Sequence, residues 1–262
     1  MIFTDKFVYV HEPKTGGTFV TSVLLRLHDV KWNRWTHLKS ILRPNLVYKT
    51  RYGAFTYNNN KHGGCNEIPE AQRHKPILAT IRNPYDLYVS DYEFGWWKRR
   101  EFLKYYRRVP DFQHTYARFP ELSFDEYLNL TSAAFGVKSN GNVGDRVGLQ
   151  TEKLVKFYFK NPQRVLSQIN DDYIAAQKYR ADMHDLHFVR TDNLNRGLYD
   201  FLIKMVYPDE DVRFVLDLGK ILPQGKGRTK GQKWEKYYTP ELKQAVRHND
   251  RLIFKMFPEF DV

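Results

Sequence analysis

Cysteine is nearly absent from this chain of 262 residues, which contains Cys65 alone. A single thiol excludes an intrachain disulfide and a zinc site built mainly from cysteine. Long apolar runs are also absent, since none approaches the roughly 20 residues that a helix needs to cross a bilayer. The first residues lead into a short apolar segment without the pattern of a signal peptide. We therefore expect a cytoplasmic protein without a membrane span.

Internal repeats and long linkers rich in serine, glycine or proline are missing as well. A chain of this length can bury a sizeable core within one domain. We therefore predict a single domain over residues 1–262. Within it, residues 98–185 carry no diagnostic motif and are expected to form a largely helical region.

Basic residues outnumber acidic ones by 42 to 30, which gives a formal net charge of +12 and a sequence pI near 9.5. Such a balance favours anionic ligands in general. Nucleic acid, an acidic membrane surface, a nucleotide and a polyanionic glycan would all fit it. Charge alone therefore narrows the class of ligand but does not identify one.

The segment FVYVHEPKTGGTFV places a Gly-containing turn between two regular elements. The pattern predicts a buried strand over 7–10 and a helix over 18–27. Backbone N–H groups of the turn at Gly16 and Gly17, together with the helix N-terminus, can surround a phosphate. The loop is not a GxxxxGK[ST] nucleotide site, because Lys14 precedes both glycines. The alternative is a glycine turn that merely begins an ordinary helix.

A second motif, ILATIRNPYDLYVSDY, begins with the apolar run Ile77–Ile81. This run predicts a buried strand, with Arg82 at its end and an Asn-Pro pair starting a helix. Ser90 lies eight residues after Arg82, so the helix can bring its hydroxyl back toward the end of the strand. The guanidinium and the hydroxyl could then bind one phosphate. The alternative is that Arg82 pairs with Asp86 at the helix start.

Strands that alternate with helices, with ligand loops at their carboxyl ends, predict the α/β fold class. We expect a three-layer, P-loop-like domain with a central parallel sheet flanked by helices. A capping box at Ser123 predicts a helix start in the middle region. Thr239 and Pro240 predict the start of a final helix that continues to Phe257.

The two motifs together resemble those of sulfotransferases that use 3′-phosphoadenosine 5′-phosphosulfate (PAPS). In that family, an R-N/D-P-x-x-x-x-x-S pattern follows a PK[TS]GG/TT loop by about 65 to 70 residues. The wording of the loop is closest to the carbohydrate-type members, although those carry an N-terminal membrane anchor. Leu186–Leu202 and Thr229–Phe260 resemble further segments of the family, with Asp192 in place of a usual Glu.

The resemblance implies a PAPS-dependent sulfotransferase that moves a sulfuryl group to a hydroxyl or amine by in-line transfer and releases adenosine 3′,5′-bisphosphate. It implies a small-molecule or carbohydrate acceptor, recognised by the region around 98–185. No metal and no nucleic acid partner are expected.

Carried over to this sequence, the resemblance assigns two phosphate sites. Lys14 would stabilise the charge on the departing phosphate oxygen. Arg82 and Ser90 would hold the 3′-phosphate, with Arg228 and Lys230 closing over it from a C-terminal loop. The 5′-phosphate side is predicted to involve Pro13, Lys14, Thr15, Gly16, Gly17, Thr18 and Phe19.

A histidine is the expected general base at neutral pH. His62 is the first choice, because it lies 20 residues before Arg82, a spacing similar to that of the catalytic histidine in several sulfotransferase subfamilies. His11 is the second candidate, since it directly precedes the loop, and Glu12 is a distant third. The alternative for His62 is an ordinary histidine in a turn.

Two other classes of function stay open. A small-molecule kinase on the same fold would require Mg²⁺, for which the chain lacks the Lys-Ser/Thr pair of a Walker loop. A non-enzymatic nucleic-acid binder would use the basic and aromatic surface and would lose affinity steeply with salt.

Overall fold

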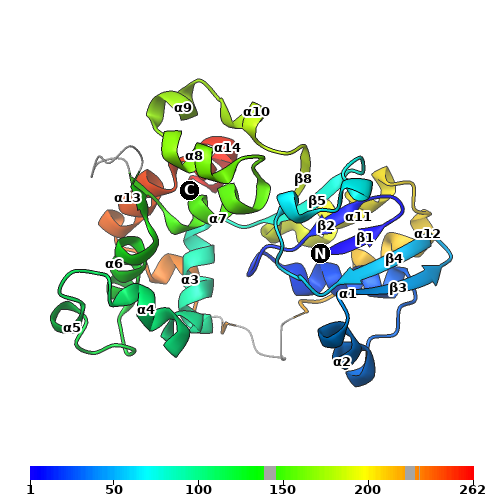
Figure 1. Cartoon of the computed structure of the whole chain (residues 1–262), viewed down its shortest axis with the longest axis horizontal. Helices are drawn as coiled ribbons and strands as arrows, with labels where there is room; N and C mark the ends of the chain where they lie inside the picture. The colour runs from blue at the N-terminus through cyan, green and yellow to red at the C-terminus, as the bar shows by residue number, and fades with distance from the viewer. Residues whose placement is uncertain (139–145, 222–227, 230) are drawn as a thin grey trace. The chain divides into compact units, whose positions relative to one another are not determined.

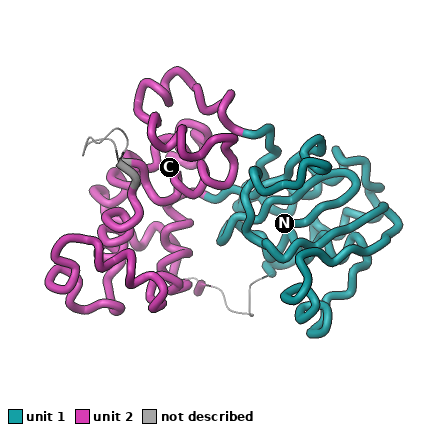
Figure 2. The backbone as a smooth tube through the Cα atoms, viewed as in Figure 1, with its two compact units in different colours: residues 1–82, 184–227 teal, residues 83–183, 228–262 magenta. Residues whose placement is uncertain are grey.

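The computed structural model describes residues 1–138, 146–221, 228–229 and 231–262. The chain forms two compact units, and each is described by itself (Figure 2). The first comprises Met1–Arg82 and His184–Gly227, and the second comprises Asn83–Met183 and Arg228–Val262. Both motifs identified in the sequence begin in the first unit. A single functional domain over the whole chain stays a prediction.

The first unit contains a six-stranded sheet with helices packed against it (Figure 1). Its strands are β1 (Ile2–Thr4), β2 (Val8–Val10), β3 (Asn45–Thr50), β4 (Gly53–Asn58), β5 (Ile77–Ile81) and β8 (Leu186–Arg190). Its α-helices are α1 (Gly17–Leu27), α2 (Arg34–Leu42), α11 (Leu194–Lys204) and α12 (Asp209–Val212). The predicted α/β class is confirmed.

The sheet is mixed, and it contains the predicted parallel core together with antiparallel strands. Its strand order is β3-β4-β1-β2-β5-β8, and only the β2-β5-β8 part is parallel. The β3–β4 pair is antiparallel because only Arg51 and Tyr52 connect the two strands, a link too short for a parallel crossover. The short link between β1 and β2 has the same effect. The parallel part is the one that positions the two motifs.

The core of the first unit lies between one face of the sheet and helices α1 and α11. Tyr9 on β2, Leu78 on β5 and Val189 on β8 share this face and are buried. They pack against apolar side chains at helical spacing, such as Val20, Val23 and Leu24 on α1 and Leu198, Phe201 and Leu202 on α11. The two strands of the motifs are buried throughout, as continuous apolar runs predict.

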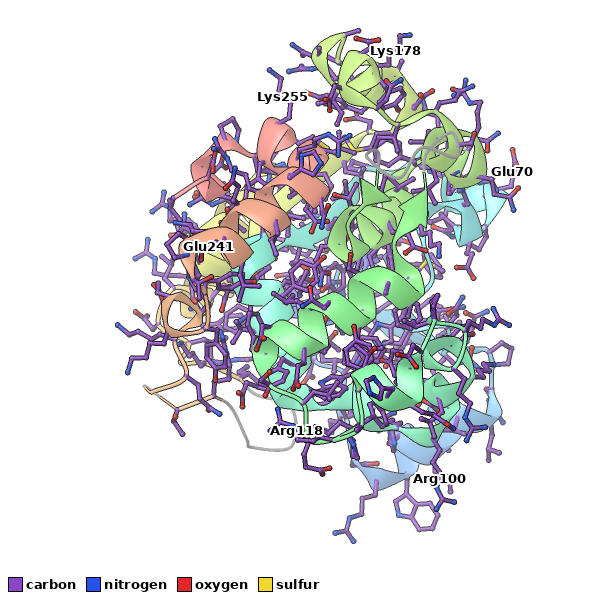
Figure 3. All side chains as sticks on the ribbon, turned by 90° about the vertical axis from the view of Figure 1, so that its left-hand side faces the viewer. Glu70, Arg100, Arg118, Lys178, Glu241 and Lys255 are labelled. Atoms are coloured by element: carbon purple, nitrogen blue, oxygen red, sulfur yellow. The ribbon has the colours of Figure 1, made fainter. Side chains whose placement is uncertain are left out.

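The second unit is almost entirely helical, and Figure 3 shows its side chains. Its helices are α3 (Pro84–Phe94), α4 (Leu103–Tyr106), α5 (Phe112–Thr115), α6 (Phe124–Phe135), α7 (Leu149–Tyr158), α8 (Pro162–Gln168), α9 (Asp171–Ala175), α10 (Tyr179–Asp182), α13 (Pro240–Asn249) and α14 (Arg251–Met256). A short hairpin joins β6 (Val137–Lys138) and β7 (Arg146–Val147). The capping box at Ser123 is confirmed at the start of α6. The region around 98–185 is thus largely helical, and its role in acceptor recognition stays a prediction.

The last helix is interrupted, which corrects the prediction of one helix from Pro240 to Phe257. Thr239 caps α13 as expected, but α13 ends at Asn249 and α14 begins after Asp250. The carboxylate of Asp250 is buried, where it accepts hydrogen bonds from the Thr151 amide (2.7 Å) and from the Tyr88 hydroxyl (2.8 Å). This carboxylate caps α7, whose own N-cap is Gly148 and has no side chain. The interruption between α13 and α14 therefore places the Asp250 carboxylate at the N-terminus of α7.

Candidate functional site

The loop between β2 and α1 turns sharply at two residues with a left-handed backbone. Lys14 has φ 69° and Gly16 has φ 93°. Glycine adopts this conformation without strain, whereas a lysine held there costs of order 1–3 kcal/mol. A Cβ at Gly16 would lie 2.7 Å from Cδ2 of Leu194, so a side chain at this position would also collide with Leu194 unless the leucine moved. The predicted glycine-containing turn between strand and helix is therefore present, and its binding of a phosphate stays a prediction.

The N-terminus of α1 is open to an anion. No side chain caps this helix at Gly16, and no acidic residue lies in its first turn. The first backbone N–H groups and the positive end of the helix dipole are thus not neutralised within α1. Lys14 and Thr18 are partly exposed beside them. The loop presents the elements of an anion site from its backbone and from one cation.

Three threonines fix the loop to the parallel strands. The Thr15 hydroxyl donates to the Glu12 carbonyl (2.8 Å), so in its 2.7 Å contact with Thr80 it acts as the acceptor. The Thr191 hydroxyl, just beyond β8, lies 3.0 Å from the carbonyl oxygens of both Thr15 and Ile81. The loop is therefore fixed to the ends of all three parallel strands.

Arg82 joins the two sequence motifs. Its Nη1 donates to the Lys14 carbonyl at 2.9 Å, across 68 residues of sequence. The pairing of β2 with β5 places the carboxyl ends of both strands side by side, so the residue after β5 reaches the loop after β2. The guanidinium predicted to bind one phosphate thus lies directly beside the loop predicted to bind another.

The two histidines predicted as candidate bases lie in contact. Nδ1 of His62 is 2.9 Å from the carbonyl oxygen of His11, and the two ring centroids are 4.8 Å apart with edge-to-face geometry. A carbonyl only accepts, so Nδ1 carries the hydrogen in this bond. The neutral ring of His62 then has its lone pair on Nε2, the atom that could accept a proton from a substrate.

Burial separates the two histidines in basicity. The pKa of His11 is lowered to about 2, first by burial and then by the nearby positive charges of Lys61, His62 and the N-terminus. The pKa of His62 is lowered by burial, and its hydrogen bond to the His11 carbonyl partly opposes this effect. The His11 side chain is only 5% exposed, whereas that of His62 is exposed to solvent. Both rings are neutral at pH 7, and His62 is the accessible one.

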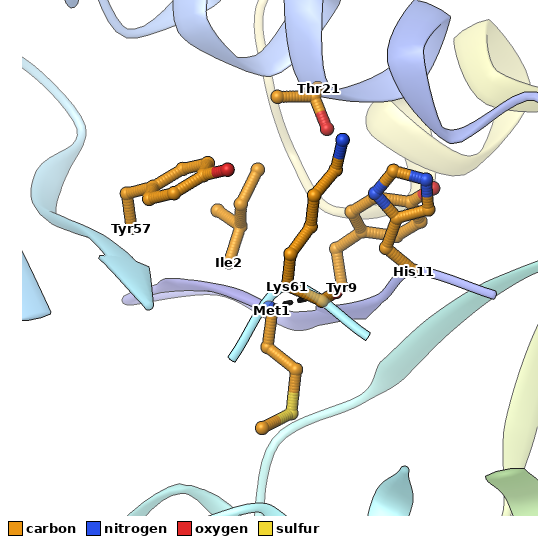
Figure 4. A pocket seen from close by; sticks show the side chains of 7 residues that line it. All are labelled: Met1, Ile2, Tyr9, His11, Thr21, Tyr57 and Lys61. Carbon is orange, nitrogen blue, oxygen red and sulfur yellow. Dashed lines mark hydrogen bonds between the residues drawn. The ribbon is translucent and has the colours of Figure 1, made fainter. Parts of the chain in front are cut away.

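A narrow pocket with no room for a water molecule lies beside His11 (Figure 4). Lys61 extends into it toward Thr21 on α1, and burial lowers the pKa of Lys61. The residues that line the pocket are Met1, Ile2, Tyr9, His11, Thr21, Tyr57 and Lys61. A half-buried basic residue thus lies beside the histidine pair.

The remaining predicted residues have different surroundings. Phe19 is buried in the core and its amide donates to the Gly16 carbonyl (3.0 Å), so its side chain supports the helix. Ser90 belongs to the second unit, where it is buried on α3. Arg228, also in the second unit, forms an ion pair with Asp86. Lys230 lies outside the described residues.

Sequence reasoning missed three residues that shape this site: Thr80, Thr191 and Lys61. Thr191 directly follows β8, as Arg82 directly follows β5, so the rule that identified Arg82 could have identified it. Lys61 is the neighbour of His62 in the chain. Thr80 lies inside an apolar strand, where a single threonine gives no distinctive signal.

Among the residues that the structure describes, no group of three or more His, Cys, Asp or Glu side chains is arranged to hold a metal ion. No helix in those same ranges is long and apolar enough to cross a membrane.

No protein-family model matches the chain, and neither does any curated protein. Among solved structures, the chain is similar to that of mouse sulfotransferase SULT7A1 complexed with PAP. The two are 14% identical, the match covers 97% of this chain and 85% of that chain, and the TM-score is 0.45. At this identity and score the similarity carries no argument about function, which therefore rests on the residues themselves.

Proposed function

We propose that this protein is a sulfotransferase that uses PAPS as its donor. The observation that carries the proposal is the hydrogen bond from Arg82 to the Lys14 carbonyl, which brings the two predicted phosphate motifs together. Either motif alone fits many anions. A loop that carries a lysine, with a guanidinium beside its backbone, favours a ligand with two phosphate groups.

The loop suits the 5′-phosphate side of such a donor. The uncapped N-terminus of α1 offers backbone N–H groups, and Gly16 and Gly17 add no side chains of their own beside them. Thr15 is fixed by internal hydrogen bonds, so its contribution to a ligand would come from its amide. PAPS supplies an activated sulfuryl group when bound. The chain contributes the amides from Thr15 to Thr18 and the Thr18 hydroxyl.

Lys14 is proposed as the cation that stabilises the negative charge developing on the leaving phosphate oxygen. Its strained backbone holds the residue at the tip of the loop. Arg82 is proposed to select for the 3′-phosphate, and so to distinguish this donor from nucleotides that lack it. Ser90, Arg228 and Lys230 stay proposed partners of that phosphate on the basis of the sequence pattern.

His62 is proposed as the general base. A base must hold a proton in the transition state, and His11, with a pKa near 2, is poorly suited to do so at neutral pH. His62 is more accessible, and its bond to the His11 carbonyl directs the lone pair to Nε2. His11 is then a positioning residue that holds His62 through its backbone. Glu12 is buried beneath the loop, which argues against it as the base.

The acceptor is proposed to be a hydroxyl or amine on a small molecule or a carbohydrate, recognised by the region around 98–185. The cytoplasmic location is part of the same proposal. Both stay predictions from the sequence.

Calorimetry of the full chain with nucleotides tests the donor. We expect adenosine 3′,5′-bisphosphate to bind, and to stabilise the protein against unfolding by about 2.7 kcal/mol at 100 times its Kd. AMP and ADP should give a much smaller effect. A preference for ATP with Mg²⁺ would instead identify a kinase, and the absence of any preference for the bisphosphate would refute the proposal.

Single substitutions test the residue roles once an acceptor has been found by screening with labelled PAPS. Lys14→Ala and His62→Ala should lower kcat by about 10²- to 10⁴-fold, since each removes a group that acts in the transition state. Arg82→Ala should mainly weaken binding of the bisphosphate. His37→Ala, on exposed α2, is the matched control and should retain full activity. A fully active His62→Ala enzyme would exclude His62 as the base.

A further inference from the structure

Helix α2 presents its apolar side to solvent and its polar side to the protein. Ser40 is the buried residue of this helix, while Trp35, Ile41 and Leu42 are 73%, 62% and 73% exposed. A surface helix of a globular protein normally has the opposite arrangement. Figure 1 shows α2, in dark blue, standing out from the first unit near β3. The helix does not use its apolar side chains for folding.

These apolar side chains form one continuous stripe. At about 100° per residue, Trp35, Leu38, Ile41 and Leu42 fall within an arc of roughly 120°. Ser40 falls on the opposite side of the helix. We call this stripe the apolar face of α2.

The strand that follows α2 in the chain carries a further exposed apolar residue. Val47 on β3, which begins three residues after α2 ends, is 66% exposed. Of the ten exposed large hydrophobic residues in the described part of the chain, five therefore belong to α2 and β3. Scattered apolar residues are normal on a surface, but such a cluster marks an interaction site.

The charge around the apolar face has one sign. No acidic residue occurs between Asp29 and Glu67. The same stretch contains seven basic residues: Lys31, Arg34, Lys39, Arg43, Lys49, Arg51 and Lys61. The first four of these border α2 and are exposed. The helix is also preformed, because Asn33 and Thr36 make a complete capping box at its start.

We infer that α2 binds in the plane of a membrane surface that contains anionic lipids. The apolar face would enter the boundary between head groups and acyl chains, and the bordering arginines and lysines would contact the acidic head groups. Exposed tryptophan and leucine beside basic residues is the composition that such interfacial helices share. This binding site is independent of the proposed transfer reaction.

Other occupants fit the observations less well. A second copy of this chain would bring the same basic residues together, and like charges oppose such a contact. Nucleic acid would pair with the basic residues but would leave Leu38, Ile41 and Leu42 exposed. A membrane surface uses both properties at once.

Vesicle flotation of the full chain tests this inference. We expect binding to phosphatidylcholine vesicles that contain 30% phosphatidylserine and little binding to pure phosphatidylcholine vesicles. Leu38→Ser with Leu42→Ser should weaken binding by at least tenfold. Arg34→Glu with Arg43→Glu should weaken it by more than about twentyfold, because each basic residue near an anionic surface contributes about fivefold. All four side chains are exposed, so circular dichroism should show unchanged folding.

Two matched controls test whether vesicle binding depends on the apolar face of α2 or only on net charge and on exposed apolar residues in general. Val206→Ser removes an apolar side chain that is 79% exposed elsewhere on the first unit. Lys178→Glu with Lys255→Glu makes the same change in net charge on the second unit, at residues labelled in Figure 3. Both controls should bind the vesicles within about twofold of the wild type.

Three results would overturn the inference. The wild type could bind both vesicle types equally, or the double serine variant could bind as the wild type does. If the double serine variant binds as the wild type does and only the double arginine variant loses binding, the vesicles are bound by charge attraction alone, as a nucleic acid would be. A dimer in the wild type that the double serine variant abolishes would assign the apolar face to a second copy of the chain.

Discussion

The substitution Gly17→Ala probes the contact between the histidine pair and the loop that joins β2 to α1. Gly17 is the first residue of α1, and a Cβ at this position would lie 1.8 Å from Nε2 and 2.0 Å from Cδ2 of His11. Such distances are far inside van der Waals contact, so the imidazole must move. The ring is buried and packs against Tyr9 and His62, so its movement disturbs both neighbours.

Two effects of opposite sign compete in this variant. Alanine is favoured over glycine in a helix by up to about 1 kcal/mol. Overpacking a buried site costs about 1–3 kcal/mol. Because three atoms of the His11 ring lie within 2.5 Å of the new carbon, we expect the second effect to dominate. The free energy of unfolding should fall by about 1–2 kcal/mol, which corresponds to a decrease in Tm of about 2–6 °C for a chain of this size.

Urea unfolding followed by circular dichroism measures this change, and calorimetry with adenosine 3′,5′-bisphosphate reports on the loop. Gly219→Ala is the control, since a Cβ there meets no atom within 4 Å and should change stability by less than about 0.5 kcal/mol. In a His11→Ala background the cost of Gly17→Ala should disappear, because the colliding ring is gone. The close approach of the His11 ring to Gly17 is refuted if Gly17→Ala is as stable as the wild type. It is also refuted if Gly17→Ala lowers stability by the same amount in the His11→Ala background.

Further predictions concern three residues away from the reacting groups. Thr191→Val should lower the free energy of unfolding by about 1–3 kcal/mol and weaken bisphosphate binding, because it removes the hydroxyl that donates to the Thr15 carbonyl. Thr191→Ser keeps this hydroxyl and is the control. Equal bisphosphate binding by both variants in calorimetry would contradict the prediction. Burial raises the pKa of Asp250 to about 6 from 3.8, so the folded state keeps a proton that the unfolded state has released, and stability falls as the pH rises from about 4 to 6. Asp250→Asn should not show this fall in stability. The difference in the free energy of unfolding between wild type and variant should therefore change by about 3 kcal/mol between pH 4 and 6. Parallel pH curves for the two proteins would refute the prediction. Burial also raises the pKa of the Cys65 thiol to about 12, so a thiol reagent at pH 8 should label it only after unfolding, and rapid labelling of the native protein would show that the thiol is accessible.

The sequence by itself determined those elements whose signals are local. Ile77–Ile81 is a strand with the predicted bounds, because a short apolar run rich in β-branched residues can be satisfied only in a buried strand. Pro84, Ser123 and Thr239 mark helix starts as predicted, since a cap depends on residues within one turn. The turn between β2 and α1 follows from Gly16, which allows a backbone conformation that few other residues adopt.

Only the tertiary structure decided which of these elements meet. The antiparallel half of the sheet depends on pairing between strands far apart in the chain, such as β1 with β4, and the period of two in a strand does not reveal its partner. The contacts of Arg82 and Thr191 with the loop follow from the side-by-side carboxyl ends of β2, β5 and β8. The position of His62 against His11 depends on the path of the stretch that separates them by 51 positions and contains α1, α2, β3 and β4. Residue types therefore specified the chemistry that each segment can perform, and long-range packing specified which segments perform it together.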